Sequence, residues 1–159
     1  MMPPLSVSTS TARGKRGQQF QAIGRSRGGL TSKIHAVVDA LGNPLKYEVT
    51  AGNINDCVAG YEILQTLDVE GKNVMADRGY DTNKIMTLLE EKHAHVVIPS
   101  RKHRMVQRPT DWFNERHLVE CLFNKLKHNR RLATRYDKLA VTFTAFLHLA
   151  SAISGWLKI

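Results

Sequence analysis

The stretch NVMADRGYDTNKIMTLLEEKHAHVVI, residues 73–98, decides the fold of this chain. Its first apolar run, Val74 to Ala76, ends at Asp77 and predicts a short buried strand. Asp81 or Thr82 can cap a helix after that strand. A second apolar run, Val96 to Ile98, then predicts another strand. A strand, a helix and a strand in this order indicate two parallel neighbours in one sheet.

The chain before this stretch predicts antiparallel pairing. Apolar residues between Lys33 and Val38 form one strand, the turn residues 40–44 follow, and residues 45–49 alternate as a second strand. A helix capped by Asn55 or Asp56 is expected next. The fold class is therefore α/β, with a mixed sheet flanked by helices.

The first thirty residues are basic and rich in serine, threonine and glycine. Leu5, Val7 and Thr9 alternate with serines, which predicts a short strand over residues 4–11. We divide the chain into residues 1–30, a basic arm with an incomplete or degenerate first strand, and residues 31–159, the main domain.

Charge indicates a polyanionic partner. The 159 residues carry a net charge of +9 and the pI is about 9.8. Residues 1–38 hold six lysines and arginines and no acid, and residues 101–138 hold eleven against four acids. An acidic middle between basic flanks suits a carboxylate centre with phosphate-contacting arms, although a solvated surface produces the same pattern.

A long helix is predicted from Asp111 to about Arg131, since this stretch contains no internal glycine or proline. At about 100° per residue, Arg116 and Lys127 lie about 40° and 20° from Glu120 on one stripe. Phe113 and Arg131 share that stripe. The apolar residues Leu118, Val119, Leu122 and Leu126 fall on the opposite side, where they can pack on a sheet.

Four separated motifs resemble those of bacterial insertion-sequence transposases of the DDE type. Phe113, Arg116, Glu120 and Lys127 are similar to the Tyr-Arg-Glu-Lys signature of that family, with Phe at the Tyr position. Residues 77–81, DRGYD, resemble its second-Asp motif. Residues 24–35, GRSRGGLTSKIH, and 135–138, RYDK, are also similar. The resemblance covers about residues 20–150.

This resemblance implies a ribonuclease H-like fold and a metal-dependent enzyme. Asp77, after the fourth strand, and Glu120, on a helix beside the sheet, would be catalytic and would bind Mg²⁺ or Mn²⁺. Two such ions can activate a water or a 3' hydroxyl and stabilise the leaving oxygen at a scissile phosphate. The expected DNA-binding residues are Arg116, Lys127, Lys125, Arg130, Arg131 and Tyr80.

One acid of the family pattern is missing, because no Asp or Glu precedes Asp39. Ser8-Thr9 or Ser10-Thr11 can occupy the place of the family's Asp-Ser-Thr segment, with Val7 or Thr9 where the acid should stand. A decayed element, a reading frame completed by frameshifting and a substitute acid remain as explanations. Asp56 is a candidate substitute but fits a helix cap better, and Asp39 fits a turn.

The functional prediction is a transposase domain for DNA strand cleavage and strand transfer in the transposition of an insertion sequence, incomplete as translated. The alternative is a noncatalytic DNA-binding repressor, or a remnant, that acts at transposon ends. The expected partners are double-stranded DNA of transposon ends and target, and either a second copy or the product of an upstream overlapping frame. We expect a cytoplasmic, nucleoid-associated protein, because no signal peptide is evident and the apolar segment 139–157 is better explained as a core helix than as a membrane span.

Overall fold

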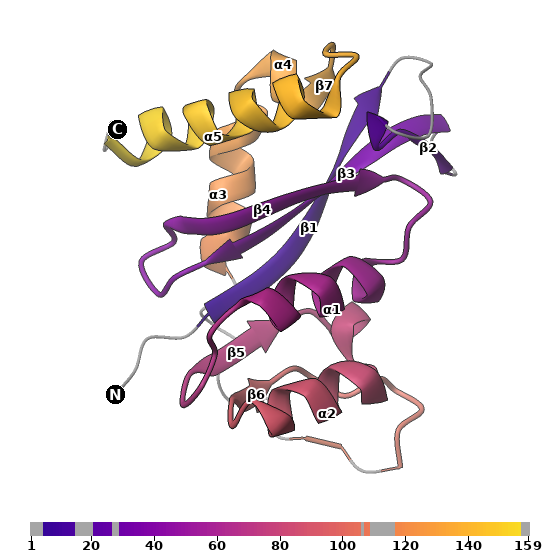
Figure 1. The fold of residues 1–159 in the computed structure, drawn as a ribbon, viewed down its shortest axis with the longest axis vertical. Coiled ribbons are helices and arrows are strands. Elements are labelled where there is room, and N and C mark those ends of the chain that lie inside the picture. Colours follow the sequence, from indigo (N-terminus) through magenta and orange to yellow (C-terminus); the bar gives the residue numbers. More distant parts are fainter. Residues whose placement is uncertain (1–4, 15–20, 27–28, 106, 109–116, 157–159) are drawn as a thin grey trace.

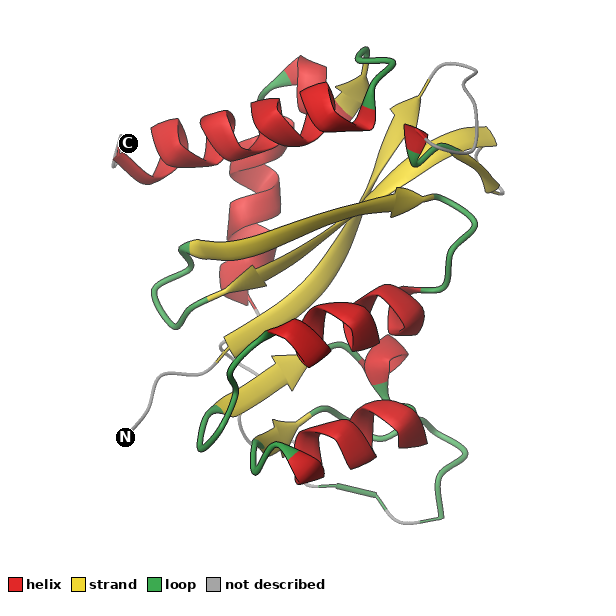
Figure 2. Cartoon of the chain, viewed as in Figure 1, coloured by secondary structure: helices red, strands yellow, loops and turns green. Residues whose placement is uncertain are grey.

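A mixed β-sheet forms the centre of the molecule, with helices on both of its faces (Figures 1 and 2). The structure, a computed structural model, describes residues 5–14, 21–26, 29–105, 107–108 and 117–156. The strands are β1 (Leu5–Gly14), β2 (Gly24–Ser26), β3 (Gly29–Val38), β4 (Pro44–Ala51), β5 (Asn73–Ala76), β6 (His95–Val97) and β7 (Thr134–Arg135). The helices are α1 (Asp56–Thr66), the 3-10 turn η2 (Arg78–Tyr80), α2 (Asn83–Glu91), α3 (His117–Lys127), α4 (Arg130–Ala133) and α5 (Ala140–Trp156).

The strand order across the sheet is β4, β3, β1, β5 and β6. β3 runs antiparallel to both β4 and β1, whereas β5 is parallel to β1 and β6 is parallel to β5. The short strands β2 and β7 extend the sheet at the ends of β3 and β1. This arrangement confirms the expected ribonuclease H-like mixed sheet flanked by helices.

The first strand corrects one expectation from the sequence. β1 is ten residues long and pairs with β3 from Ser6 opposite Val38 to Arg13 opposite Thr31. It lies between β3 and β5, so it is a central strand and not an incomplete one. The alternation of apolar residues ends early, but backbone pairing with β3 continues along the polar residues that follow Val7. The strand is therefore longer than its apolar pattern. β1 and β2 share one sheet with the rest of the chain.

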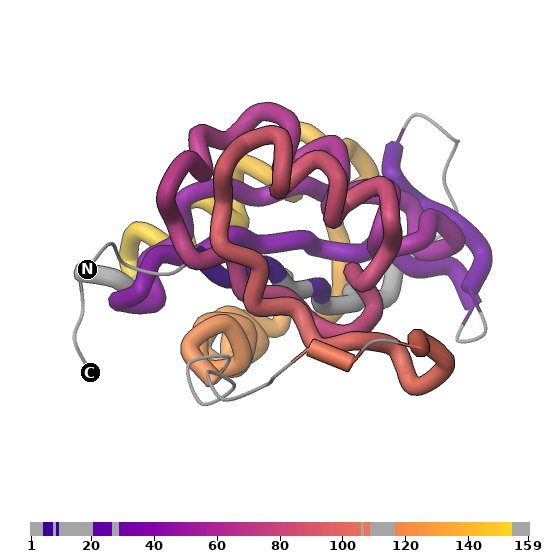
Figure 3. Tube along the Cα trace, turned by 90° about the horizontal axis from the view of Figure 1, so that it is seen from below, coloured from indigo at the N-terminus to yellow at the C-terminus, as the bar shows by residue number. Residues whose placement is uncertain are grey.

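Two apolar cores cover the two faces of the sheet. On one face, residues of α1 and α2 such as Ile63 and Leu89 pack with Val37 of β3. On the other, residues of α3 and α5 pack with Ala36 and Val38 of the same strand. Side chains alternate between the two faces of a strand, so neighbouring residues of β3 pack into different cores. Figure 3 shows α1 and α2 on one side of the strands and α3 on the other.

The long helix expected over residues 111–131 is interrupted. Residues 109–116 lie outside the described part, α3 ends at Lys127, and α4 begins after Asn129. In an unbroken helix Leu132 would lie roughly 120° around the axis from the buried Leu126. The turn at His128 and Asn129 instead brings Leu132 into the core, where it is 3% exposed. The expectation of one continuous helix to Arg131 was therefore wrong.

The last helix, α5, packs in the core as expected. Phe143 and Leu147 are fully buried, and Ser151 joins Tyr47 of β4 through a hydroxyl pair 2.7 Å apart. No helix in the described part of the chain combines the length and apolar content that a membrane span needs.

Turn and cap residues behave mostly as the sequence predicts. Asp39 stabilises the β3–β4 turn by accepting hydrogen bonds from the backbone N–H groups of Leu41 and Asn43, at 2.8 and 2.9 Å. Asn55 caps α1, and Thr82 caps α2. Asp81, the other candidate cap for α2, is buried and takes a different role described below.

Candidate metal and DNA-binding site

Asp77 stands at the carboxyl end of β5, where the strand gives way to η2. Its side chain caps that turn by accepting a hydrogen bond from the backbone N–H of Arg78 at 2.7 Å. The residue is exposed. Val74 and Ala76 pack in the core under α1 and α2, so alternation assigns position 77 to the opposite face, the one that α3 covers.

The pairing between β1 and β5 ends one residue before Asp77. Val7 pairs with Ala76 in the parallel β1–β5 register, and one step along both strands leads to positions 8 and 77. Position 8 also alternates with Val7, which is 1% exposed in the core under α1. Alternation along a strand therefore assigns backbone positions 8 and 77 to the same face of the sheet.

The surroundings of β1 bear on where the missing acid would stand. Val7 belongs to the α1 core, and the Thr9 hydroxyl bonds to Tyr80 and His35 on that same side of the sheet. A carboxylate at position 7 or 9 would thus be on the opposite face from Asp77. Asp56, the candidate substitute, forms an ion pair with Lys33 at 2.7 Å at the start of α1.

Glu120 lies on α3, which packs on the same face of the sheet as position 77. Val119 and Phe123 of α3 are buried against Ala36 of β3, and Glu120 is exposed beside them. The two acids therefore belong to one side of the sheet. Within the described residues, no three His, Cys, Asp or Glu side chains come close enough together to hold a metal ion.

The expected DNA-binding residues have different environments. Lys125 and Lys127 are exposed in the last turn of α3, and Arg130 is exposed in α4. Arg131 is exposed but forms a two-bond ion pair with Asp137, at 2.9 and 2.6 Å. Arg116 lies outside the described residues.

Tyr80 is not placed to contact DNA. The side chain is 2% exposed, packs against Gly60 of α1 and shares a 2.5 Å hydrogen bond with the Thr9 hydroxyl. Burial raises the pKa of its phenol well above the usual range. The sequence predicts a DNA contact for Tyr80, but its ring is part of the core.

Two other motif residues are also structural. The Arg135 guanidinium is buried at 1% exposure, where it donates to Ser32 Oγ at 2.5 Å and to the Ala22 carbonyl at 3.2 Å. Desolvation lowers the pKa of Arg135, against the opposing charge of Asp137. His35 is buried between the hydroxyls of Thr9 and Thr50, each 2.9 Å away. Desolvation lowers the pKa of His35 to about 4, so the imidazole is neutral at pH 7.

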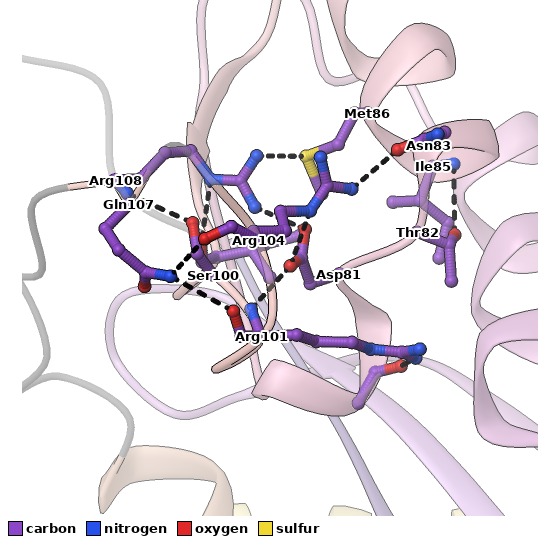
Figure 4. Close-up of polar contacts among 12 residues, drawn as sticks. Asp81, Thr82, Asn83, Ile85, Met86, Ser100, Arg101, Arg104, Gln107 and Arg108 are labelled. Carbon is purple, nitrogen blue, oxygen red and sulfur yellow. Dashed lines mark hydrogen bonds and ion pairs between the residues drawn. The ribbon is translucent and has the colours of Figure 1, made fainter.

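Sequence reasoning missed a cluster of arginines around Asp81 (Figure 4). The Asp81 carboxylate accepts hydrogen bonds from the backbone N–H of Arg101 at 2.7 Å, from Arg104 Nε at 2.9 Å and from Arg108. Burial alone would raise the pKa of Asp81, but these bonds and charges hold it below its usual range. An acid followed some 20 residues later by a run of cations was the available signal.

The chain thus combines a mixed sheet flanked by helices with one acid directly after β5 and another on α3. The family model described as "Transposase DDE domain" matches residues 6–154, so the chain belongs to that family of transposases. This confirms the family that the sequence motifs indicated, and membership makes the protein an enzyme by family.

Individual proteins similar to the chain are also described as transposases. The chain is 39% identical over 132 residues to a putative transposase for insertion sequence element IS6501 from Brucella ovis, covering 81% of this chain and 100% of the relative. It is 30% identical over 135 residues to a putative transposase for insertion sequence element IS402 from Burkholderia cepacia, covering 79% of this chain and 63% of that protein. A piggyBac transposase synaptic complex with hairpin DNA is similar at a TM-score of 0.45 and 15% identity, over 64% of this chain and 23% of that one.

Proposed function

We propose that this chain is a DNA-binding domain of a DDE transposase whose metal centre lacks its first carboxylate. The observation that supports the proposal is the β1–β5 register, in which Val7 pairs with Ala76 and the next residue of β1 is a serine and not an acid. Glu120 supplies a second acid, on α3. The exposed cations Lys125, Lys127 and Arg130 would bind DNA phosphates.

Among the residues that the structure describes, Asp77 and Glu120 have no third acid close enough to complete a two-ion centre. Carboxylate oxygens are suitable ligands for Mg²⁺ and Mn²⁺, but a serine hydroxyl at position 8 brings no negative charge. One carboxylate oxygen of Asp77 also accepts the hydrogen bond that caps η2. When bound, divalent ions supply the polarisation and nucleophile activation that strand cleavage and strand transfer require. We expect the natural chain to hold such ions weakly and to leave DNA strands intact.

Adding the acid tests the proposal directly. The Ser8→Asp variant should bind Mn²⁺ at least tenfold more tightly than the natural chain in calorimetric titrations, and it should cleave DNA that carries the terminal repeats of the element. Ser8→Asn is the matched control, with the same shape and no charge. Adding Asp77→Asn to Ser8→Asp should remove the gain. A folded Ser8→Asp chain with unchanged Mn²⁺ affinity would contradict the proposal.

A second function is favoured by the exposed cations of α3 and α4, which do not depend on the acid set. A noncatalytic chain with these cations could occupy transposon ends or pair with an active transposase, and so repress transposition. Gel-shift titrations with terminal repeats and with a scrambled duplex should then show a preference for the repeats. Equal affinity for both duplexes, and no mixed oligomer with a full-length relative in sedimentation experiments, would argue against repression.

A further inference from the structure

A basic loop follows β6, and it consists of residues 100–105, 107 and 108. Four consecutive residues of this loop are Arg101, Lys102, His103 and Arg104. The loop contains no acid, and Lys102 and His103 are exposed. The lysine and the two arginines in this run repel one another unless something neutralises part of their charge.

Asp81 provides that neutralisation from inside the domain (Figure 4). Its side chain is 0% exposed and forms ion pairs with both Arg104 and Arg108. Arg108 is held further by hydrogen bonds from Nε to the Ile98 carbonyl at 3.1 Å and from its backbone N–H to Ser100 Oγ at 3.0 Å. Two of the arginines therefore serve to fix the loop.

The backbone of the basic loop is fixed as well. The N–H of Arg104 donates to the Arg101 carbonyl at 3.0 Å, which closes a turn. The Gln107 side-chain amide donates to the carbonyls of Arg101 and Arg104, at 3.2 and 2.8 Å. A loop ordered in this way loses little conformational entropy when it binds a ligand.

Two cations of the loop, Arg101 and Lys102, are exposed to solvent. The Arg101 side chain is exposed, and its Nη2 donates to the Gly79 carbonyl at 3.0 Å, on the η2 turn that Asp77 caps. Lys102 forms no ion pair with any residue that the structure describes. Figure 3 shows the basic loop on the side of the strands where α3 lies. Arg101 of the loop thus contacts the same turn that the candidate metal ligand Asp77 caps.

We propose that Arg101 and Lys102 bind phosphates of the DNA backbone next to the phosphate that reaches Asp77. Asp81 is the positioning residue for this contact. The inference rests on the proposed DNA-binding function and adds a second contact region, on a different element from α3 and α4. A guanidinium can bind a phosphate through two parallel hydrogen bonds, and an ammonium binds it as a point charge. Such contacts set the register of the duplex without reading its sequence.

The salt dependence of DNA binding tests the proposal. Each lost phosphate contact lowers the slope of log affinity against log salt by about 0.9. Lys102→Ala and Arg101→Ala should each lose about one unit of slope and bind a fluorescent duplex several-fold more weakly at about 0.1 M salt. Lys46→Ala is the matched control, because Lys46 lies on β4 at the other edge of the sheet and bonds to Thr66.

Asp81→Asn separates positioning from charge. If Asp81 acted only through its negative charge, its removal would strengthen binding to DNA. Release of the basic loop instead weakens binding and lowers the slope, and circular dichroism and urea unfolding verify that the variant is folded. Should Asp81→Asn fail to fold, the exposed positions 101 and 102 decide the outcome alone.

Several results would overturn the inference. Wild-type slopes for both loop variants, together with reduced slopes for Lys125→Ala and Lys127→Ala, would remove the loop contact and leave the proposed function standing. Loop variants that weaken binding to single-stranded RNA but not to duplex DNA would assign the loop to a different partner. A natural chain that binds no duplex at about 50 mM salt would remove the proposed function itself.

Discussion

The hydroxyl groups of Thr9 and Tyr80 lie 2.5 Å apart, although 71 residues separate them in the sequence. The same Thr9 oxygen lies 2.9 Å from Nδ1 of His35, whose Nε2 lies 2.9 Å from the hydroxyl of Thr50. These four side chains come from β1, η2, β3 and β4. They connect the turn that follows Asp77 to the centre of the sheet.

Removal of the Tyr80 hydroxyl should destabilise the fold. Tyr80→Phe keeps the ring in the core but leaves Thr9 with one partner fewer in a buried position. We expect a loss of about 1–2 kcal/mol in the free energy of unfolding, measured by urea denaturation. Tyr136→Phe serves as control, since Tyr136 is 52% exposed, and should leave the stability unchanged. An equal effect of the two substitutions would contradict a structural role for the Tyr80 hydroxyl.

Gly60 makes the close packing of Tyr80 possible. A Cβ at position 60 would collide with the Tyr80 ring, 2.5 Å from Cδ1. Alanine normally favours a helix over glycine by about 1 kcal/mol, but overpacking of a core costs about 1–3 kcal/mol. The ring is held by its hydroxyl and by the core around it. The cost of the collision should therefore exceed the gain in helix propensity, and Gly60→Ala should lower the melting temperature.

The neighbouring turn offers the control for this substitution. A Cβ at Gly79 would have no atom within 4 Å. Gly79→Ala should therefore change the free energy of unfolding by less than about 0.5 kcal/mol. If Gly60→Ala raised the melting temperature instead, helix propensity would outweigh the contact with Tyr80.

Local patterns in the sequence were sufficient to predict much of the fold. The apolar run before Asp77 and the caps at Asn55 and Thr82 depend on neighbours within a few residues, and each element forms where expected. Backbone pairing across a sheet carries no such local signal. For this reason the apolar pattern predicted only part of the length of β1, which pairs with β3 as far as Arg13.

The other differences between the predicted and the observed site arise from contacts between residues far apart in the sequence. The sequence predicts a DNA contact for Tyr80, but a partner from a distant segment holds its hydroxyl in the core. Arg135 of the RYDK motif is buried in the same way by a distant partner. Asp81 looks like a helix cap, and its partners are 20 or more residues further along the chain. The predicted helix is interrupted before Leu132. Burial of the Leu132 side chain stabilises the fold more than one continuous run of helical hydrogen bonds would.

The buried His35 should make stability depend on pH in a defined window. Desolvation lowers its pKa to about 4, with a smaller opposing effect from Asp56 and a smaller supporting one from Lys33. The unfolded chain, with the usual value near 6.5, binds the proton first. The stability contributed by neutral His35 is therefore complete above about pH 6.5 and is lost as the pH falls towards 4, by about 3 kcal/mol at most.

Urea unfolding at a series of pH values measures this loss. Asp81 and Asp137, whose pKa values are held low by their arginine partners, lose their contributions mainly below the window of His35. His35→Gln should flatten the decline between pH 6.5 and 4.5, whatever its effect on absolute stability. An identical decline in that variant would assign the pH dependence to other groups.

Arg130 and Arg131 are adjacent in α4, yet they should contribute unequally to DNA binding. Arg131 is held by two hydrogen bonds to Asp137, whereas Arg130 is exposed and forms no ion pair with a described residue. A guanidinium paired with a carboxylate has its charge largely compensated, so it attracts a phosphate less. Arg130→Ala should lower the salt slope of duplex binding by about one unit, and Arg131→Ala should lower it by less. Asp137→Asn releases Arg131 and should strengthen binding, an effect that the double variant Asp137→Asn with Arg131→Ala should lose. Equal slopes for Arg130→Ala and Arg131→Ala would show that DNA displaces Asp137 and that the ion pair does not limit the contact.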